Sequence, residues 1–391
     1  MEATSERAVA RTTELAVLDV SKLLWSFASL MEKDVALVNA LSTEAARRVD
    51  EFAPQGLSNL LWAFATLRVL AEQHALLSVV AHRVHGMARE LKPQEAANVA
   101  WAFARVRAGA PGLFRAIAAA ARPRIRDYNA MELSGLAWAF AASGTRDKAM
   151  FGVIEVEALA KARLLGPREL ANLLWAVTTA ESGGARQLCR CLAPHVARRL
   201  HDFRPQEMSN LLWAYTRSHE CHQTLLQIAA DEAIVKLKGH RHQGLSNLAW
   251  SFATLVVETP HLWRAIGLEV TARARDLNPQ ETTSIMWAFG RLACCHRAFE
   301  VLAEAAEEGV AAFRPQDLAN AAWATAALGA VGRTELLRAI AQRAAAGLAE
   351  FAPQEVSSLA WAFAALGADD PGLLAAVAED VVHRVKEFKL Q

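Results

Sequence analysis

Hydrophobic residues recur at helical spacing in segments centred on a tryptophan. The stretch 54–67, Pro-Gln-Gly-Leu-Ser-Asn-Leu-Leu-Trp-Ala-Phe-Ala-Thr-Leu, repeats its large apolar residues three and four apart, the pattern of one buried helix face. Ten Trp residues share this register at spacings of 36 to 39 residues: Trp25, Trp62, Trp101, Trp138, Trp175, Trp213, Trp250, Trp287, Trp323 and Trp361. Self-similarity at a nearly fixed period predicts an array of repeats rather than several unrelated domains.

Each repeat is predicted to contain two helices. In seven repeats a Pro stands eight residues before the Trp, as at Pro54 and Pro353, and Pro suits the first turn of a helix because it lacks an N–H. The stretches between these segments, for example 262–277 and 335–351, carry a second helical pattern, and Gly and Pro gather at the joints. The sequence therefore predicts an all-α fold, an α-solenoid of about ten helical hairpins in one domain over residues 1–391, with no separate catalytic domain.

A helical wheel divides the Trp-centred helix into three faces. At about 100° per residue, one broad arc predicts the core of the hairpin. In the second repeat this arc contains Leu57, Leu60, Leu61, Phe64 and Leu67. The Trp and the small residue four before it lie on an adjacent flank, where the next hairpin is expected to stack. A third, polar and variable stripe gathers the residues six and three before the Trp and one and four after it, such as Gly56, Asn59, Ala63 and Thr66.

Two positions of this stripe supply the candidate binding residues. Asn is the commonest residue three before the Trp, and Thr or Arg stands four after it in six repeats. The candidates are Asn59, Thr66, Asn98, Arg105, Asn172, Thr179, Asn210, Arg217, Asn247, Thr254, Arg291 and Asn320. The Asn amides suit either the edge of a base or a ladder of hydrogen bonds between hairpins. Variation at the Thr/Arg position is what a modular reader needs, and it is also typical of a solvated face.

The repeated Trp residues have two interpretations. Aromatic faces stack on any base, which is consistent with a binding platform. Their constancy and their place in an apolar helix favour instead a structural wedge between repeats.

Basic clusters stand near the ends of the longer helices, at Arg122-Arg124-Arg126, Arg198-Arg199, Arg273-Arg275 and Arg384-Lys386. They suit either a phosphate backbone or, without any ligand, the negative end of a helix dipole.

Metal and catalytic signals are weak. The clusters His219-Glu220-Cys221-His222 and His240-Arg241-His242 lack the paired spacing of a structural zinc site. No phosphate-binding glycine loop or nucleophile elbow is present, so the sequence predicts neither an enzyme nor a cofactor or metal.

Composition restricts the partners and the compartment. The chain has 391 residues, is 53% hydrophobic, and balances 42 Lys and Arg against 41 Asp and Glu, for a net charge of +1. That balance predicts almost no overall attraction for nucleic acid. Five Cys, two pairs of them close in sequence, favour a reducing compartment. The first residues, Met-Glu-Ala-Thr-Ser-Glu-Arg, resemble neither a signal peptide nor a transit peptide, and no stretch predicts a membrane span.

The repeat motif resembles a known family. The segments 52–67, 313–328 and 351–366, with Pro-Gln, often Asn, and a Trp-Ala dipeptide in register, resemble the octotricopeptide repeats of algal and protist organelle proteins. They are also similar to the helical repeats of FAST kinase-like, RAP-domain-associated proteins of mitochondria. Tetratricopeptide repeats fit poorly, since their period is about 34 residues. The resemblance covers nearly the whole chain, although no RAP-like domain follows and no transit peptide is visible, as expected for the repeat region of a longer protein.

The resemblance implies an organellar RNA-binding protein, in the mitochondrial matrix or the chloroplast stroma, that acts in RNA processing, mRNA stability or translation. We expect it to bind single-stranded RNA along the concave face of the solenoid, about ten nucleotides at roughly one per repeat. Other organellar RNA-processing proteins are expected as further partners, and a membrane is not. The rival hypothesis is a scaffold whose groove holds a peptide or helix of a partner protein, and the near-neutral charge favours it.

Overall fold

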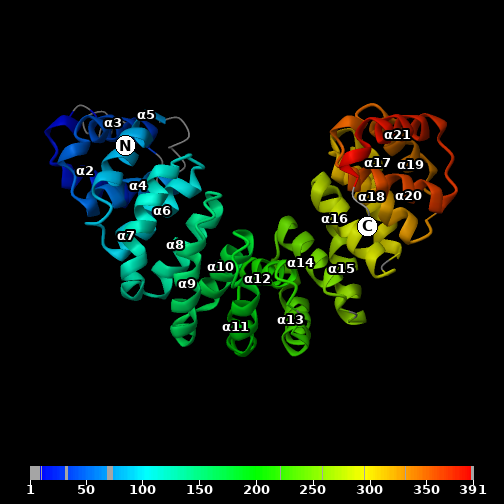
Figure 1. Cartoon of the computed structure of the whole chain (residues 1–391), viewed down its shortest axis with the longest axis horizontal. Coiled ribbons are helices and arrows are strands. Elements are labelled where there is room, and N and C mark those ends of the chain that lie inside the picture. The colour runs from blue at the N-terminus through cyan, green and yellow to red at the C-terminus, as the bar shows by residue number, and fades with distance from the viewer. Residues whose placement is uncertain are drawn as a thin grey trace. The chain divides into compact units, whose positions relative to one another are not determined.

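The chain folds into α-helices joined by short turns. The computed structural model describes residues 9, 11–30, 34–67, 74–220, 222–257, 259–294, 296–330 and 332–388. These residues form twenty α-helices, α2 to α21, and no strand. The predicted all-α solenoid of helical hairpins is confirmed, and Figure 1 shows the helices in order along the chain. No helix among the described residues is long and apolar enough to cross a membrane.

The Trp-centred helices, here called A helices, begin at the predicted residues. All seven Pro residues that precede the Trp by eight positions are the first residue of their helix. The A helices are α2 Val17–Leu30, α4 Pro54–Leu67, α6 Pro93–Arg105, α8 Ala130–Ala142, α10 Pro167–Thr179, α12 Pro205–Arg217, α14 His242–Thr254, α16 Pro279–Arg291, α18 Pro315–Ala327 and α20 Pro353–Leu366.

The partner helices, here called B helices, are shorter than the sequence suggests. They are α3 Val35–Arg47, α5 His74–Gly86, α7 Pro111–Ala121, α9 Lys148–Ala160, α11 Ala185–Arg199, α13 Gln223–Lys236, α15 Pro260–Arg273, α17 His296–Gly309, α19 Thr334–Ala345 and α21 Pro371–Arg384. The predicted helix 335–351 ends at Ala345, and a 3-10 turn, Leu348–Glu350, follows it. This tighter turn lets Phe351 leave the helix in an extended conformation and become buried at 2% exposure.

The chain divides into two compact units. The first contains residues 1–196 and 217–220, and the second contains 197–216 and 221–391. Within each unit the A helices pack against successive A helices far more extensively than the B helices pack against B helices. The A helices therefore form the tighter layer of each unit. The predicted core arc, Leu57, Leu60, Leu61, Phe64 and Leu67, is at most 2% exposed, which confirms it.

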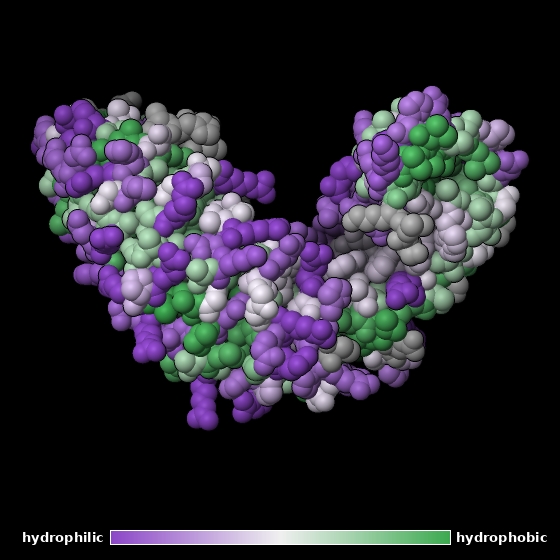
Figure 2. Space-filling view, viewed as in Figure 1, coloured by the Kyte–Doolittle hydropathy of each residue, from purple (hydrophilic) through white to green (hydrophobic). Residues whose placement is uncertain are grey.

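Apolar side chains on the outer surface of the B helices are dispersed. Val156 on α9, Val235 on α13 and Leu268 on α15 are 70%, 78% and 69% exposed, and each belongs to a different hairpin. Figure 2 shows hydrophobic areas interrupted by hydrophilic side chains. Isolated exposed apolar residues of this kind are ordinary in soluble domains, so these three do not mark a binding surface.

In eight repeats, the residue six after the Trp follows the end of the A helix in the left-handed backbone conformation. This residue is left-handed at Gly144, Gly329 and Gly367, and also at Arg107, Glu181, His219, Val256 and Ala293, with φ between 48° and 74°. The next N–H returns to the carbonyl of the residue two after the Trp, as from Val257 N to Phe252 O at 2.9 Å, in a Schellman-type cap. The register of the turn is thus held even where no Gly occupies it.

Val256 is the most strained of these residues. Its φ of 54° is costly for a β-branched side chain, and its side chain is 48% exposed, so it gains little from burial. We expect Val256→Gly to raise the free energy of unfolding by about 1 kcal/mol, because relief of left-handed strain outweighs the entropy cost of Gly. The measurement is the urea midpoint at constant m-value.

The reverse change supplies the control. Gly367 has φ 62° at the same repeat position, and no atom lies within 4 Å of where a Cβ would be. Gly367→Val should therefore lower the midpoint through backbone strain alone. A stabilising Gly367→Val, or a destabilising Val256→Gly, would contradict the strain assigned to this position.

Candidate nucleic-acid interface

The exposed stripe of the A helices differs from the predicted one. Positions are numbered from the repeat Trp, with negative numbers toward the N-terminus. Positions −7, −3, 0 and +4 fall within an arc of about 60° at about 100° per residue, and this arc is half-buried or exposed along the chain. We call this surface the A-helix face. The −3 and +4 positions of the predicted stripe lie on this arc, whereas −6 and +1 lie to one side of it and are buried in several repeats.

Positions −6 and +1 are used for folding. At position −6, Glu95 Oε2 accepts the N–H of Lys92 at 2.8 Å, and Glu281 Oε2 accepts the N–H of Asn278 at 2.9 Å. The acid at this position thus caps the first turn of its own helix, where the helix dipole also favours a negative charge. At position +1, Ala63, Ala102 and Ala214 are 0% exposed. These contacts give both positions a structural role, although Glu355 at −6 also lines the hollow described below.

The Asn residues at position −3 point to the A-helix face with their amides unused. All six are half-buried: Asn59, Asn98, Asn172, Asn210, Asn247 and Asn320. None makes a side-chain hydrogen bond to another residue of the described ranges, so the ladder between hairpins is not observed. Each amide retains its donors and acceptor for water or a ligand.

The +4 position divides by residue type. Arg105, Arg217 and Arg291 are exposed, whereas Thr66, Thr179 and Thr254 are half-buried. The Thr254 hydroxyl donates to Trp250 O at 2.8 Å, within its own helix. The hydroxyl oxygens of Thr66 and Thr179 are buried and have no hydrogen-bond partner in the described structure. Only the Arg residues extend a charged group from this position.

Several of the repeat Trp rings lie beside the Trp ring of the next hairpin. Ring centroids are 6.2 Å apart for Trp25 and Trp62, and 6.3 Å apart for Trp138 and Trp175. In the second unit, Trp250, Trp287, Trp323 and Trp361 follow at 6.5, 5.9 and 6.4 Å. The wedge interpretation therefore agrees with these contacts. Because the eight inner Trp residues are only half-buried, part of each indole also remains on the A-helix face.

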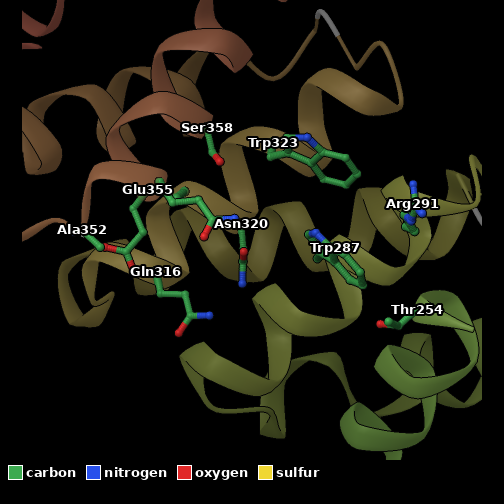
Figure 3. Close-up of a pocket in the computed structure, with 11 residues that line it drawn as sticks. Thr254, Trp287, Arg291, Gln316, Asn320, Trp323, Ala352, Glu355 and Ser358 are labelled. Atoms are coloured by element: carbon green, nitrogen blue, oxygen red, sulfur yellow. The ribbon is translucent and has the colours of Figure 1, made fainter. Parts of the chain in front are cut away.

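In the second unit these groups surround one hollow of about 510 Å³. It is lined by Thr254, Trp287, Arg291, Gln316, Ala319, Asn320, Trp323, Ala352, Gln354, Glu355 and Ser358. Figure 3 shows Trp287 and Trp323 on adjacent helices, with Asn320 and Gln316 to one side and Arg291 to the other. The volume lies within the range of small-ligand sites, and amides and a guanidinium stand beside aromatic rings.

Gln at position −7 was missed by the sequence argument. Gln316 and Gln354 line the hollow, and the residue at −7 is exposed in every repeat from α4 to α20. The signal was present, because six of the seven helix-starting Pro residues are followed by Gln. That Gln stands one residue before the first position of the predicted stripe and lies on the same face as the Asn and the Trp.

The basic clusters mainly hold the hairpins together. A basic residue 23 positions after the Trp donates a hydrogen bond to a main-chain carbonyl in the turn that precedes the A helix. Arg273 Nη1 donates to His240 O at 2.6 Å, and Arg384 Nη1 donates to Phe351 O at 2.9 Å. The equivalent Lys161 Nζ contacts Tyr128 O at 2.6 Å and pairs with Glu157 at 2.6 Å. At this repeat position the cation neutralises carbonyl groups within the fold, which gives it a structural role without any ligand.

No group of three His, Cys, Asp or Glu residues that could hold a metal occurs in the described ranges. Residues of the first His-containing cluster noted in the sequence make other contacts. Glu220 Oε1 accepts hydrogen bonds from Arg190 Nη2 at 2.7 Å and from Arg186 Nε at 2.9 Å. These bonds lower the pKa of the Glu220 carboxyl group. His222 Nδ1 accepts the N–H of Leu225 at 3.3 Å and caps α13, while Cys221 lies outside the described residues.

His240 is a buried histidine at a position of apolar side chains. It stands ten residues before Trp250, where other repeats have Phe52, Phe203 or Phe351, and it is 2% exposed. Its Nδ1 lies 3.0 Å from Ser209 Oγ, and its Nε2 is buried without a partner. Burial, with Arg273 and Lys236 nearby, lowers the pKa of the imidazole to about 4.

This histidine should make the fold sensitive to acid. The folded pKa lies below the ordinary value of 6.5, so the unfolded chain binds a proton that the folded chain excludes as pH falls from 6.5 toward 4. Stability is lost through that window, by roughly 3 kcal/mol at most at 1.36 kcal/mol per pH unit. We expect His240→Phe to remove this part of the pH dependence, as measured by urea unfolding at pH 7 and pH 5. Parallel pH profiles for the two proteins would contradict the assignment.

Comparison with known proteins gives one partial family match. Residues 1–111 match the family model described as RESC6: RNA-editing substrate-binding complex 6 protein. The matched segment contains the repeats of Trp25, Trp62 and Trp101. No curated protein matches the chain significantly.

Among solved structures, the chain is similar to one described as a homology model of the full-length AP-3 complex in an intermediate open conformation. The TM-score is 0.30 and the identity 10%, over 95% of this chain and 73% of the other. That likeness is too distant to inform the function.

Proposed function

We propose that the protein binds single-stranded RNA on its A-helix face and acts, without catalysis of its own, in organellar RNA processing, mRNA stability or translation. The observation that carries the proposal is the hollow of the second unit, where the Trp287 and Trp323 rings, the Asn320 amide and the Arg291 guanidinium meet. Aromatic side chains stack on bases, amides pair with base edges, and Arg attracts phosphate.

The spacing of the Trp rings favours an extended strand. Neighbouring ring centroids in the second unit are 5.9 to 6.5 Å apart. Stacked bases rise by only about 3.4 Å along one strand of a duplex, so a helical strand cannot keep register with the repeats. An unstacked strand with one nucleotide per repeat fits this spacing, and single-stranded RNA is the form whose base edges are open to side chains.

Two similarities support RNA as the ligand and an organelle as the compartment. The family whose model matches residues 1–111 is named for binding RNA-editing substrates. The Pro-Gln, Asn and Trp-Ala repeat motif resembles octotricopeptide and FAST kinase-like proteins, which implies the mitochondrial matrix or the chloroplast stroma.

A protein scaffold is the second candidate function. The net charge of +1 favours it, because a neutral protein attracts a polyanion weakly. In that role the same amides and Trp edges would hold a partner's peptide, and the purified chain would carry no RNA.

The test is selection from a randomised RNA pool at 100 mM salt, followed by filter binding. For the triple variant Arg291→Ala, Asn320→Ala and Gln316→Ala, we expect at least a tenfold loss of affinity for the selected RNA, since each base contact contributes about 1–3 kcal/mol. The same assay on Arg105→Ala, Arg217→Ala and Arg291→Ala together tests the charged positions.

Arg297→Ala is the matched control, because Arg297 is an exposed residue of the B helix α17, away from the A-helix face. It should bind like the unaltered chain. The absence of any enriched sequence, or equal losses in Arg297→Ala and the triple variant, would refute RNA reading by the A-helix face.

A further inference from the structure

Ion pairs join neighbouring hairpins where a B helix meets the turn before the next B helix. In the first unit, Arg190 Nη2 of α11 lies 2.7 Å from Glu220 Oε1, and Glu220 belongs to the turn before α13. In the second unit, Arg333 Nε of the turn before α19 donates to Glu300 Oε2 of α17 at 2.6 Å. Arg190 and Glu300 each stand 23 residues before the next repeat Trp. Residues at this B-helix position therefore face the next turn, and each pairs there with a group of opposite charge.

At the corresponding joint of α5, basic groups stand on both sides. The turn before α7 contains Arg107, and Ser78 and His82 of α5 stand 23 and 19 residues before the next repeat Trp. His85 lies beside the first turn of α7, since a Cβ on Gly112 would be 3.9 Å from its Nδ1. Within the described ranges, the side chains of Arg107, His82 and His85 make no hydrogen bond or ion pair. No carboxylate of the described chain thus closes this joint as it closes the other two.

This joint contains a hollow of about 540 Å³ within the first unit, here called the α5–α7 hollow. Its buried lining is apolar and at most 5% exposed, and it includes Leu77, Phe103 and Leu113. Its exposed polar lining is formed by Ser78, His82, His85 and Arg107. No Asp or Glu occurs among the lining residues that the structure describes. The hollow therefore combines an apolar base with a rim of hydrogen-bond donors that carries positive charge.

The chemistry of this rim favours a phosphate monoester. Such a group carries a charge of about −1.5 to −2 at pH 7 and has three acceptor oxygens. Two imidazoles, a guanidinium and a hydroxyl can donate to several of these oxygens at once. A carboxylate or an internal phosphodiester carries a single charge, so either would leave more of the basic rim without a partner. The volume lies in the range of about 300–1,000 Å³ that is typical of small-ligand sites, so the molecule that carries the phosphate also has room.

We propose that the α5–α7 hollow binds a small molecule through its dianionic phosphate group, which lies between Arg107, His82 and His85. The Arg107 guanidinium and the two imidazoles donate to the phosphate oxygens, and the Ser78 hydroxyl is a further donor. The bound anion then links α5 to the turn before α7, as an ion pair links the other two joints. This site is independent of RNA binding on the A-helix face, because none of its lining residues stands at position −7, −3, 0 or +4.

Isothermal titration calorimetry on the unaltered chain tests the site with three titrants: adenosine 5′-monophosphate, inorganic phosphate and adenosine. In about 50 mM chloride, we expect a dissociation constant of about 1 mM or lower for at least one of the two phosphate titrants. Adenosine should bind at least about tenfold more weakly, because it lacks the anion. Tighter binding of the nucleotide than of inorganic phosphate identifies a phosphorylated small molecule as the ligand, and the reverse order identifies the free anion.

Two variants remove the site in different ways. Ser78→Glu places a carboxylate where Glu300 stands in its own hairpin, so it should pair with Arg107 and exclude the anion. Arg107→Gly removes the guanidinium, and Gly suits the φ of 54° at this residue, as Gly144 does at the same repeat position. Each variant should lower the affinity for the phosphate titrants about tenfold or more. Neither should lower the midpoint of thermal unfolding, which shows that the loss does not come from a damaged fold.

His219→Gly is the matched control. His219 is exposed, has φ 52° at the same repeat position as Arg107, and does not line the α5–α7 hollow. This variant should bind the phosphate titrants like the unaltered chain. The absence of binding by both phosphate titrants at about 10 mM would overturn the proposal. So would adenosine that binds as tightly as its monophosphate, a Ser78→Glu variant with full affinity, or equal losses in His219→Gly and Arg107→Gly.

Discussion

The close approach of neighbouring A helices is the constraint on which the rest of the structure depends. A Cβ on Gly290 would lie 3.0 Å from Cα of Ala324 on the next A helix, so a side chain does not fit there. In the other A helices the residues at positions −4 and +3 are Ser, Ala or Thr. Small residues at −4, +1 and +3 allow the backbones to meet, and the Trp between them fills the remaining space. Because the A helices meet closely and the B helices do not, each hairpin presents the same narrow face, and the residues on it recur at regular spacing.

This constraint explains which parts of the fold could be predicted from the sequence. The positions of Leu57, Leu60 and Phe64 follow from helical periodicity, and the helix starts follow from Pro, because both depend on local chemistry. The ends of the B helices were not predictable in this way. The 3-10 turn Leu348–Glu350 is followed by Phe351, whose side chain is buried and whose carbonyl accepts a hydrogen bond from Arg384. Both are contacts between distant parts of the hairpin, which a local sequence pattern does not encode. The left-handed conformation of residues such as Val256 was not predictable from the sequence either, because Gly occupies that position in only some repeats.

The candidate site was predicted in part, for a related reason. Asn at −3 and Arg at +4 were found because polar residues recur there without an evident structural need. Glu at −6 is just as polar, but its carboxylate caps its own helix, and a wheel built on polarity alone cannot distinguish a capping residue from a surface residue. Gln at −7 follows directly on the Pro that starts the helix, so its position on the face depends on a wheel extended to the first turn.

The distribution of cations bears on the proposed binding of RNA by a chain of nearly neutral charge. Arg273, Arg384 and Lys161 donate to main-chain carbonyls, so much of the basic content is consumed by the hairpins themselves. On the A-helix face of the second unit, Arg291 stands among Trp287, Asn320 and Gln316. In the proposed complex, stacking and amide hydrogen bonds add to the phosphate attraction of a few Arg residues. In the proposed complex, selectivity depends on which bases fit between the Trp edges and the amides, and a low overall charge favours that selectivity because it limits binding to unrelated RNA.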